Sequence, residues 1–406
     1  VARIIRLSQP QIWIGWRQKA FALLMDLRLF PFVRRRASHK TGLYPHQHGV
    51  VHNRSALNTG IDTWPELLQR AGYRTGFFGK IHYATADGNQ PGGSPHPGFD
   101  RWVGFRGQGD YNDPTLIVDG KEIDHRGYNT DLLANYAEQF ISQANERPWV
   151  LCLWYKAPHG PFTPPVRYAD IHADAELPAP STLNASLSGK PFSLQNGKPM
   201  GHEQNWFPDG NFIGDKTWEV FMRDYARTMQ GADDALGRLL DVLDQTRMAE
   251  NTIVVHSSDH GYFHGEFGLA DKRWMYDPSI RVPYLVRYPQ LVQDPGRTVA
   301  DLILSLDIPA TIMDLSGLGL PDRFQGHSLR PLLDENGAWA RDDVFIQYFE
   351  DPPFPDLPTM TCLRTASEKL IHYLRDGEGD EFYDLVVDPE ERQNVVDDPA
   401  YSGQVT

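Results

Sequence analysis

Polar residues that could do chemistry follow three apolar runs of strand length. Lys80 and His82 come after the first run, His159 after the second, and Asp259 and His260 after the third. In an open parallel sheet, ligands bind in the crevice beyond the carboxyl ends of the strands. Charged groups at buried strand ends are costly unless they are paired or bound to a metal ion. Each of these residues alone is more typical of a loop or turn, but together they predict one functional site.

These residue types are suited to the turnover of an anion. Lys80 and Lys272 could neutralise charge on a tetrahedral oxyanion, and Asp259 with His260 could hold a divalent cation that acts as a Lewis acid. Two ligands are fewer than a hard cation needs. No residue after position 40 is an evident nucleophile. The residues therefore describe a charge-stabilising half-site whose reactive half is missing.

The hydrophobic pattern indicates the elements that must position these residues. Apolar runs alternate with amphipathic segments, which is typical of a parallel sheet covered by helices on both faces. The expected strands are 75–79, 149–155, 252–256 and 282–287, and the expected helices are 63–71, 131–144 and 218–245. Clusters of Gly, Pro, Asn and Asp predict long surface loops at 88–126 and 161–214, which we expect to shape the substrate pocket. From about residue 342, short β-like segments predict a small antiparallel C-terminal subdomain.

Composition excludes several classes of protein. The 406 residues carry 39 Lys and Arg against 53 Asp and Glu, a formal net charge of −14, which argues against a nucleic-acid partner. No apolar run approaches the ~18–20 residues of a membrane span. The two cysteines allow one disulfide at most, so no disulfide framework holds the fold. We expect a soluble protein, cytoplasmic or periplasmic, whose oligomeric state the sequence does not define.

The first 36 residues differ from the rest of the chain. They carry seven arginines and one lysine against a single acid. A basic amphipathic helix or a transit peptide has this character, whereas no cleavage site of a secretory signal is evident. A third interpretation is that this segment is not the native N-terminus of the domain that follows. We expect three parts: an aberrant or out-of-frame segment at 1–36, an α/β domain incomplete at its N-terminus at 37–340, and a small C-terminal α+β subdomain at 341–406.

Motifs in consistent order between about residues 36 and 399 resemble the sulfatase family, of the formylglycine-dependent arylsulfatase type, in the alkaline phosphatase superfamily. The matching segments are 41–50 (TGLYPHQHGV), 72–75 with 79–82 (GYRT and GKIH), 157–162 (APHGPF), 258–261 (SDHG), 265–269 (GEFGL), Lys272, 281–283 (RVP) and 383–394 (YDLVVDPEERQN). The resemblance implies an alkaline-phosphatase-like fold, a mostly parallel sheet flanked by helices. It also implies metal-dependent cleavage of a sulfate monoester, with a small aryl or sugar sulfate as the substrate.

Roles for individual residues follow from this resemblance by position. Lys80 and Lys272 would bind the sulfate oxygens. His82 would assist the nucleophile or the breakdown of a covalent intermediate, and His159 would act near the leaving-group oxygen.

The resemblance also implies that Asp259 and His260 are metal ligands. Family members normally use calcium, which is our first choice. An imidazole at position 260 leaves manganese and zinc as alternatives.

The chain departs from the family at the nucleophile. The family makes a formylglycine from the Cys of a C-x-P-x-R motif, and here Arg36 keeps the end of that motif. Counting back from it, Phe32 stands at the nucleophile position and Arg34 at the proline position. No acidic pair precedes Arg36, so the two metal-binding aspartates of the first strand are absent as well. We therefore expect a sulfuric ester hydrolase whose activity is impaired in this chain.

The genetic code permits one explanation of this departure. Read from the third base of the Pro10 codon, the codons of residues 10–16 permit Pro-Asn-Leu-Asp-Arg-Leu, which is similar to a family segment shortly before the nucleophile. The same frame permits Cys over Phe32 and Val33. We therefore predict that residues from about Pro10 to Arg35 are an out-of-frame translation of an ordinary sulfatase N-terminus. Two other functions stay open: a phosphonate or phosphate monoester hydrolase, and a non-catalytic pseudoenzyme that binds an anion.

Overall fold

The computed structural model describes most of the chain after residue 32. The described residues are 23–28, 33–52, 55–58, 60–81, 83, 92–143, 147–196, 211–212, 216–334, 337–352 and 354–405, without the side chains of 23–28, 33–35, 211–212 and 216. The expected boundaries at 36 and 340 are not tested by these residues and stay predictions.

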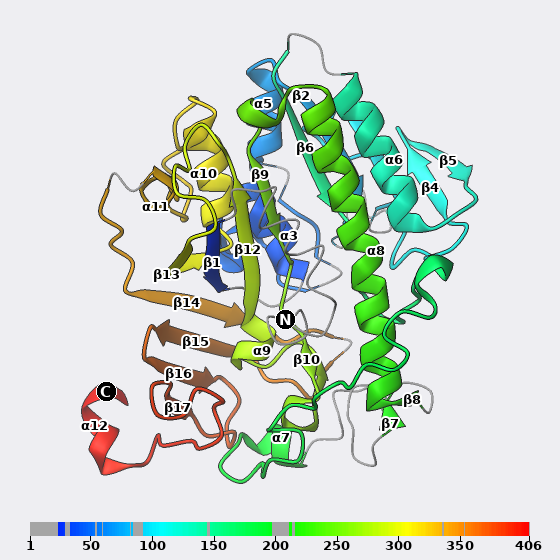
Figure 1. Cartoon of the computed structure of the whole chain (residues 1–406). Coiled ribbons are helices and arrows are strands. Elements are labelled where there is room, and N and C mark those ends of the chain that lie inside the picture. The colour runs from blue at the N-terminus through cyan, green and yellow to red at the C-terminus, as the bar shows by residue number, and fades with distance from the viewer. Residues whose placement is uncertain are drawn as a thin grey trace.

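Two sheets form the centre of the molecule (Figure 1). The first has the order β5-β4-β3-β2-β6 and the second the order β13-β1-β12-β9. Pairing is parallel for β2 with β3, β2 with β6 and β1 with β13, and antiparallel for the other neighbours. The α/β class is therefore confirmed, with sheets that are mixed. Their strands are β1 (Leu23–Arg28), β2 (Arg74–Gly79), β3 (Arg101–Gly104), β4 (Thr115–Val118), β5 (Lys121–Asp124), β6 (Trp149–Trp154), β9 (Val254–Ser257), β12 (Arg281–Arg287) and β13 (Thr298–Leu304).

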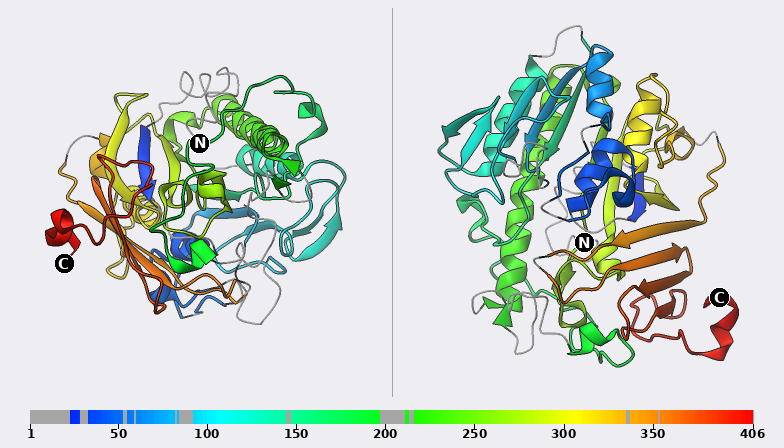
Figure 2. Two further views of the ribbon diagram at one scale, coloured as in Figure 1. Left: turned by 90° about the horizontal axis from the view of Figure 1, so that it is seen from below. Right: turned by 180° about the vertical axis from the view of Figure 1, so that it is seen from behind.

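Helices cover both faces of the sheets, as Figure 2 shows from two further sides. Successive side chains of a strand point to opposite faces. Phe78 of β2 accordingly packs with residues of α6 (Asn129–Ser142) and α8 (Trp218–Gln245). Phe77 packs with residues of α3 (Val33–Thr41), α5 (Trp64–Arg70) and α10 (Asp307–Leu315) on the other face. The expected helices at 63–71, 131–144 and 218–245 are confirmed to within two residues at each end.

The long helix α8 shows how sequence defines an element here. The Thr217 hydroxyl caps its N-terminus by accepting from the backbone N–H of Val220. Phe221, Tyr225 and Leu239 recur at helical spacing, and all three are buried. This buried stripe was expected as a core face and is confirmed as one.

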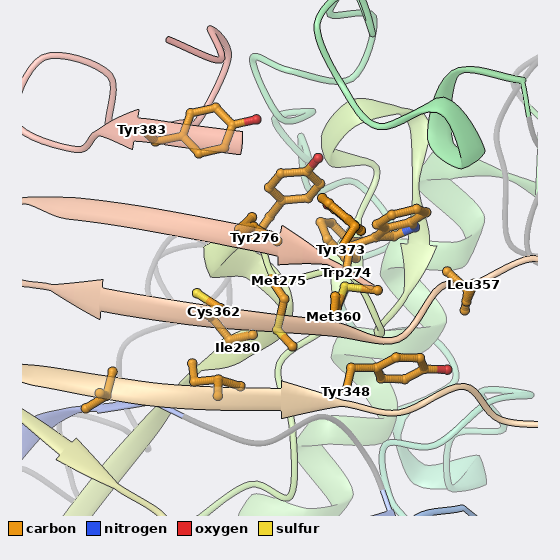
Figure 3. Packing of buried hydrophobic residues seen from close by; sticks show 14 of the residues in the cluster. Trp274, Met275, Tyr276, Ile280, Tyr348, Leu357, Met360, Cys362, Tyr373 and Tyr383 are labelled. Carbon is orange, nitrogen blue, oxygen red and sulfur yellow. The ribbon is translucent and has the colours of Figure 1, made fainter. Parts of the chain in front are cut away.

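A four-stranded antiparallel sheet forms the C-terminal part, as expected from the short β-like segments. Figure 3 shows its strands with Met275, Tyr276 and Ile280 lying over them. Lys369 is fully buried, and its Nζ donates to the Met275 carbonyl (3.0 Å) and to Asp277 Oδ1 (2.6 Å). The strands are β14 (Asp343–Tyr348), β15 (Met360–Thr365), β16 (Glu368–Tyr373) and β17 (Glu381–Asp384).

One loop prediction was wrong in part. The segment 88–126 contains β3, β4 and β5, which extend the first sheet. Asp119 and Gly120 form the tight turn between β4 and β5 with positive φ angles, so residues typical of a loop concealed a sheet edge. The segment 161–214 has little regular structure over its described part, as expected. The remaining short elements are α4 (Pro45–His48), η1 (Val166–Tyr168), α7 (Phe192–Asn196), β7 (Asn211–Phe212), β8 (Lys216–Thr217), η3 (Ala249–Asn251), β10 (Phe263–His264), η4 (Glu266–Gly268), β11 (Ala270–Asp271), α9 (Asp277–Ile280), α11 (Arg330–Asp334), η5 (Pro399–Tyr401) and α12 (Ser402–Val405).

Within the described part of the chain, no helix combines the length and the apolar character that crossing a bilayer would require.

Candidate functional site

Lys80 is held at the point where β2 and β6 end together. Its backbone N–H donates to the Trp154 carbonyl at 2.8 Å. The preceding residue, Gly79, has φ 128°, and a Cβ there would lie 1.9 Å from that same carbonyl oxygen. Only glycine therefore allows β2 to turn this close to β6. The turn places the Lys80 side chain in the interior, where it is 1% exposed.

Arg36 joins the loops that follow β2 and β9. Its Nε and Nη2 donate to Asp259 Oδ2 at 3.1 and 2.8 Å. Its Nη1 donates to the backbone carbonyl of Lys80. A buried, always-charged guanidinium is well suited to hold a carboxylate in this way. Arg36, from α3, thus fixes Asp259 beside Lys80.

Lys272 follows β11 and reaches the same site. It is 3% exposed, and its Nζ lies 3.1 Å from Asp271 Oδ1, a carboxylate that also pairs with Arg273. Burial lowers the pKa of Lys272 to about 7, with opposing contributions from the charges of Asp259 and Arg36. Such interactions weaken with distance, so they indicate that Lys272 lies close to Arg36 and Asp259.

The charges of Arg36 and Lys272 also act on Lys80. Burial lowers the pKa of Lys80 well below its ordinary value, and the charges of Arg36 and Lys272 lower it further, while Asp259 raises it. Arg36, Lys80 and Lys272 thus share the carboxylate of Asp259 in a buried place, and Lys272 also pairs with Asp271. Such a set is short of negative charge and is suited to receive an anion.

His159 is neutral in this surrounding. Burial lowers the pKa of His159 well below its ordinary value, and the charges of Lys80 and Lys272 act in the same direction. Its Nδ1 lies 2.7 Å from the Gly160 carbonyl oxygen, which can only accept, so Nδ1 carries the proton. The Nε2 atom is then the basic one, and a bound anion would raise its affinity for a proton.

Asp259 and His260 supply two of the donors that a metal site would need. Burial lowers the pKa of His260 to about 3, and its Nδ1 donates to the Gly261 carbonyl at 2.7 Å, which leaves Nε2 with its lone pair. That Nε2 lies 3.4 Å from Asp259 Oδ1, so two donors are close together. No cluster of three or more His, Cys, Asp and Glu suited to a metal ion occurs among the described residues. The set does not fit the six to eight oxygen ligands of calcium or the four of zinc.

The structure brings five of the six predicted site residues together, namely Lys80, His159, Lys272, Asp259 and His260. The sixth, His82, lies outside the described residues, as does Phe32 at the expected nucleophile position. The individual roles of all six stay predictions.

Three further residues border the site. The sequence marks Arg36 as the end of a motif, and this position was a signal that it belongs to the site. Gln108 contacts the Lys80 ammonium from the turn after β3, and nothing in its sequence context points to the site. Lys156 is 4% exposed, and its charge lowers the pKa values of Lys80 and His159. Its position in the sequence between β6 and His159 could have indicated that it lies at the site.

Comparison with known proteins gives the family. Residues 33–318 match the sulfatase family model, and residues 265–406 match the model of the C-terminal part of N-sulphoglucosamine sulphohydrolase. The chain is 30% identical to N-acetylglucosamine-6-O-sulfatase of Bacteroides thetaiotaomicron, over 90% of this chain and 74% of that protein.

Solved structures agree with this result. A protein in complex with its substrate D-glucosamine-2-N,6-O-disulfate has a TM-score of 0.85 at 27% identity, covering 98% of this chain and 90% of that one. A phosphonate monoester hydrolase from Silicibacter pomeroyi shares the fold, with a TM-score of 0.78 at 22% identity over 98% of this chain and 88% of that one. The expected alkaline-phosphatase-like fold is confirmed, and the chain belongs to the sulfatase family of sulfuric ester hydrolases.

Proposed function

We propose that this site binds the sulfate group of a sulfated amino sugar of the N-acetylglucosamine 6-sulfate type, and that the chain as its sequence stands does not hydrolyse the ester. Sulfate binding is supported by a cluster of buried cations. Arg36, Lys80 and Lys272 are all buried and act on one another electrostatically, with Asp259 as their common counter-charge and Asp271 as a second partner of Lys272. A sulfate oxyanion supplies the negative charge that this cluster lacks.

The choice of an amino sugar rests on the relatives. One is an N-acetylglucosamine-6-O-sulfatase, and another was solved with a sulfated glucosamine as its substrate. An aryl sulfate would present the same anion to the lysines. Discrimination between the two therefore depends on groups around the sugar ring.

His159 is the group of this chain that could hold a proton for the leaving oxygen. It is neutral before binding, because burial and the charges of the surrounding lysines both lower the pKa of its imidazole. A sulfate bound between Lys80 and Lys272 offsets those charges and raises the pKa of His159. The Nε2 atom would then take up a proton where the ester oxygen departs.

The absence of hydrolysis is proposed because the sequence has no nucleophile at the family position. The family position of the nucleophile is Phe32, whose phenyl group cannot attack sulfur. Asp259 and His260 supply two metal donors, and the Asp259 carboxylate is held by Arg36. The site can thus bind and polarise a sulfate ester while it lacks the attacking group.

Calorimetric titration of the chain with N-acetylglucosamine 6-sulfate tests the binding, with unsulfated N-acetylglucosamine as the ligand control. We expect binding of the sulfated sugar only. In Lys80→Met this binding is lost, whereas Lys121→Met, which removes an exposed lysine of β5, leaves it unchanged. Equal binding of both sugars, or equal loss in both variants, would contradict the proposal.

A further inference from the structure

Lys156 is a buried cation to which sulfate binding by Lys80 and Lys272 gives no role. It stands two residues past the end of β6 and is 4% exposed. Its Nζ lies 4.6 Å from the centre of the Tyr111 ring. Among the residues that the structure describes, this ammonium forms neither a hydrogen bond nor an ion pair, and Asp110 acts on it through charge alone. Burial of an ammonium without a partner is costly, and groups of this kind mark functional sites.

Tyr111 fixes the position of this ammonium. The Tyr111 hydroxyl donates to the His159 carbonyl at 2.7 Å, and its ring is stacked on that of Tyr128 with 5.6 Å between the ring centroids. The Tyr128 hydroxyl donates in turn to the Thr163 carbonyl at 2.9 Å. The backbone adds a direct link, because the Lys156 carbonyl accepts from the His159 N–H at 2.8 Å. The Lys156 side chain and His159 therefore belong to one rigid unit before any ligand binds.

The charge of Lys156 reaches the sulfate site. Burial contributes most to the low pKa of His159, and the charges of Lys80 and Lys272 come next. Lys156 adds a smaller contribution in the same direction. Burial is also the main cause of the low pKa of Lys80, which Lys156 lowers less than Arg36 and Lys272 do. Because such interactions weaken with distance, Lys156 lies within electrostatic reach of both residues, at the margin of the site.

Lys156 is suited to bind an anion near neutral pH. Burial lowers the pKa of Lys156 to about 8, against the charge of Asp110, which raises it. The side chain is therefore still mainly protonated at pH 7. A sulfate or carboxylate oxygen beside Nζ would accept charge-assisted hydrogen bonds, which are stronger than those between neutral groups. Since His159 is expected near the leaving-group oxygen, this anion would belong to the sugar and not to the sulfate that is cleaved.

We propose that Lys156 forms a second anion subsite, so that the preferred ligand of this site carries a further sulfate or carboxylate besides the sulfate bound by Lys80 and Lys272. Two sources have this chemistry: an N-sulfate on the same glucosamine ring, and the carboxylate of a uronic acid linked to that ring. Lys156 would then select among sulfated sugars by contact with the second group. The inference rests on the proposed function, because it requires that His159 lies between the bound sulfate and the sugar.

The test is calorimetric titration of the full chain at pH 7 with three sugars. N-acetylglucosamine 6-sulfate carries one anion, glucosamine 2-N,6-O-disulfate carries a second on its own ring, and a disaccharide of N-acetylglucosamine 6-sulfate with a uronic acid carries it on the neighbouring ring. We expect one of the doubly anionic sugars to bind about tenfold more tightly than the first. In Lys156→Met and in Lys156→Gln this preference should fall to about twofold or less, because the cation is removed. Lys121→Met, at an exposed position of β5, is the matched control and should keep the full preference.

The measured quantity is a ratio of two affinities on the same protein, so a general loss of stability in a variant does not change it. A preference that is lost in both Lys156 variants supports the subsite, and the sugar that shows it identifies the source of the second anion. Equal affinities for the three sugars, as expected if an acid of the chain already holds the ammonium, overturn this inference alone. A preference that survives in the Lys156 variants also overturns it. Absence of binding by all three sugars overturns the proposed function and this inference with it.

Discussion

Anion binding at this site should depend on pH through Lys272. Burial holds the pKa of this side chain at about 7 before an anion binds. A sulfate group beside the ammonium favours its charged form, so binding raises the pKa toward its ordinary value and takes up a proton. Binding is therefore strongest below pH 7 and weakens as the pH rises through 7, where the empty site has lost the proton that the occupied site needs.

The size of the effect follows from the pKa. With a pKa of about 7, Lys272 is about 90% protonated at pH 6 and about 10% at pH 8, so the apparent affinity for sulfate should fall about tenfold over this range. The pKa of Lys80 is lowered as well, so its ionisation adds to the fall in the same direction. In Lys272→Arg the guanidinium stays charged throughout. The variant should therefore lose the contribution of Lys272 and keep that of Lys80.

The assay is calorimetric titration with inorganic sulfate from pH 6 to 8, at constant ionic strength, in two buffers of different ionisation enthalpy. The number of protons taken up per sulfate should be smaller by about one at high pH in Lys272→Arg than in the unchanged chain. Lys121→Arg, at an exposed position, is the matched control and should follow the unchanged chain. Parallel pH curves for the unchanged chain and Lys272→Arg would refute the reasoning, even if the variant binds more weakly overall.

Three further predictions follow from the same features. Titration with calcium should show weak binding, because two donors are too few for a hard cation; tight binding that is lost in Asp259→Ala would show that other acids complete the site. Lys369→Met should lower the free energy of unfolding by about 3–5 kcal/mol in urea denaturation, because it removes the buried cation that pairs with Glu391 and leaves Asp277 with Arg364, whereas Lys121→Met should leave it unchanged. Sequencing of the coding region should reveal a Cys codon over Phe32 and Val33 in the shifted frame, and its absence would favour a divergent pseudoenzyme instead.

Much of the fold was predictable because its strands are long, apolar and separated by amphipathic helices. The helix at 218–245 has a strict helical period, so its buried face could be assigned from the sequence. β3 to β5 could not, because each has only four residues and the segments that connect them are rich in glycine and aspartate. The antiparallel pairing of β12 with β9 depends on contacts far apart in the chain and has no local signal.

The site was predictable to the extent that its residues directly follow strands. Lys80 and Asp259 stand one and two residues past the ends of their strands and His159 five, so the strand ends bring them together. Gln108 comes from a turn whose position is fixed by tertiary packing, and no local pattern marks it. The link from Arg36 to Asp259 spans 223 positions and required the structure.

The proposed function requires that this chain binds a sulfate ester at Lys80 and Lys272 and does not hydrolyse it. One NMR experiment tests it directly: N-acetylglucosamine 6-sulfate is incubated with the chain and calcium, and the signals of the sugar C6 protons are followed over time. We predict broadening of the signals of the sulfated sugar, reversed by excess inorganic sulfate, with no growth of signals from unsulfated N-acetylglucosamine. Growth of those signals that is abolished in Lys80→Ala would contradict the claim, because it would show a working site without the expected nucleophile.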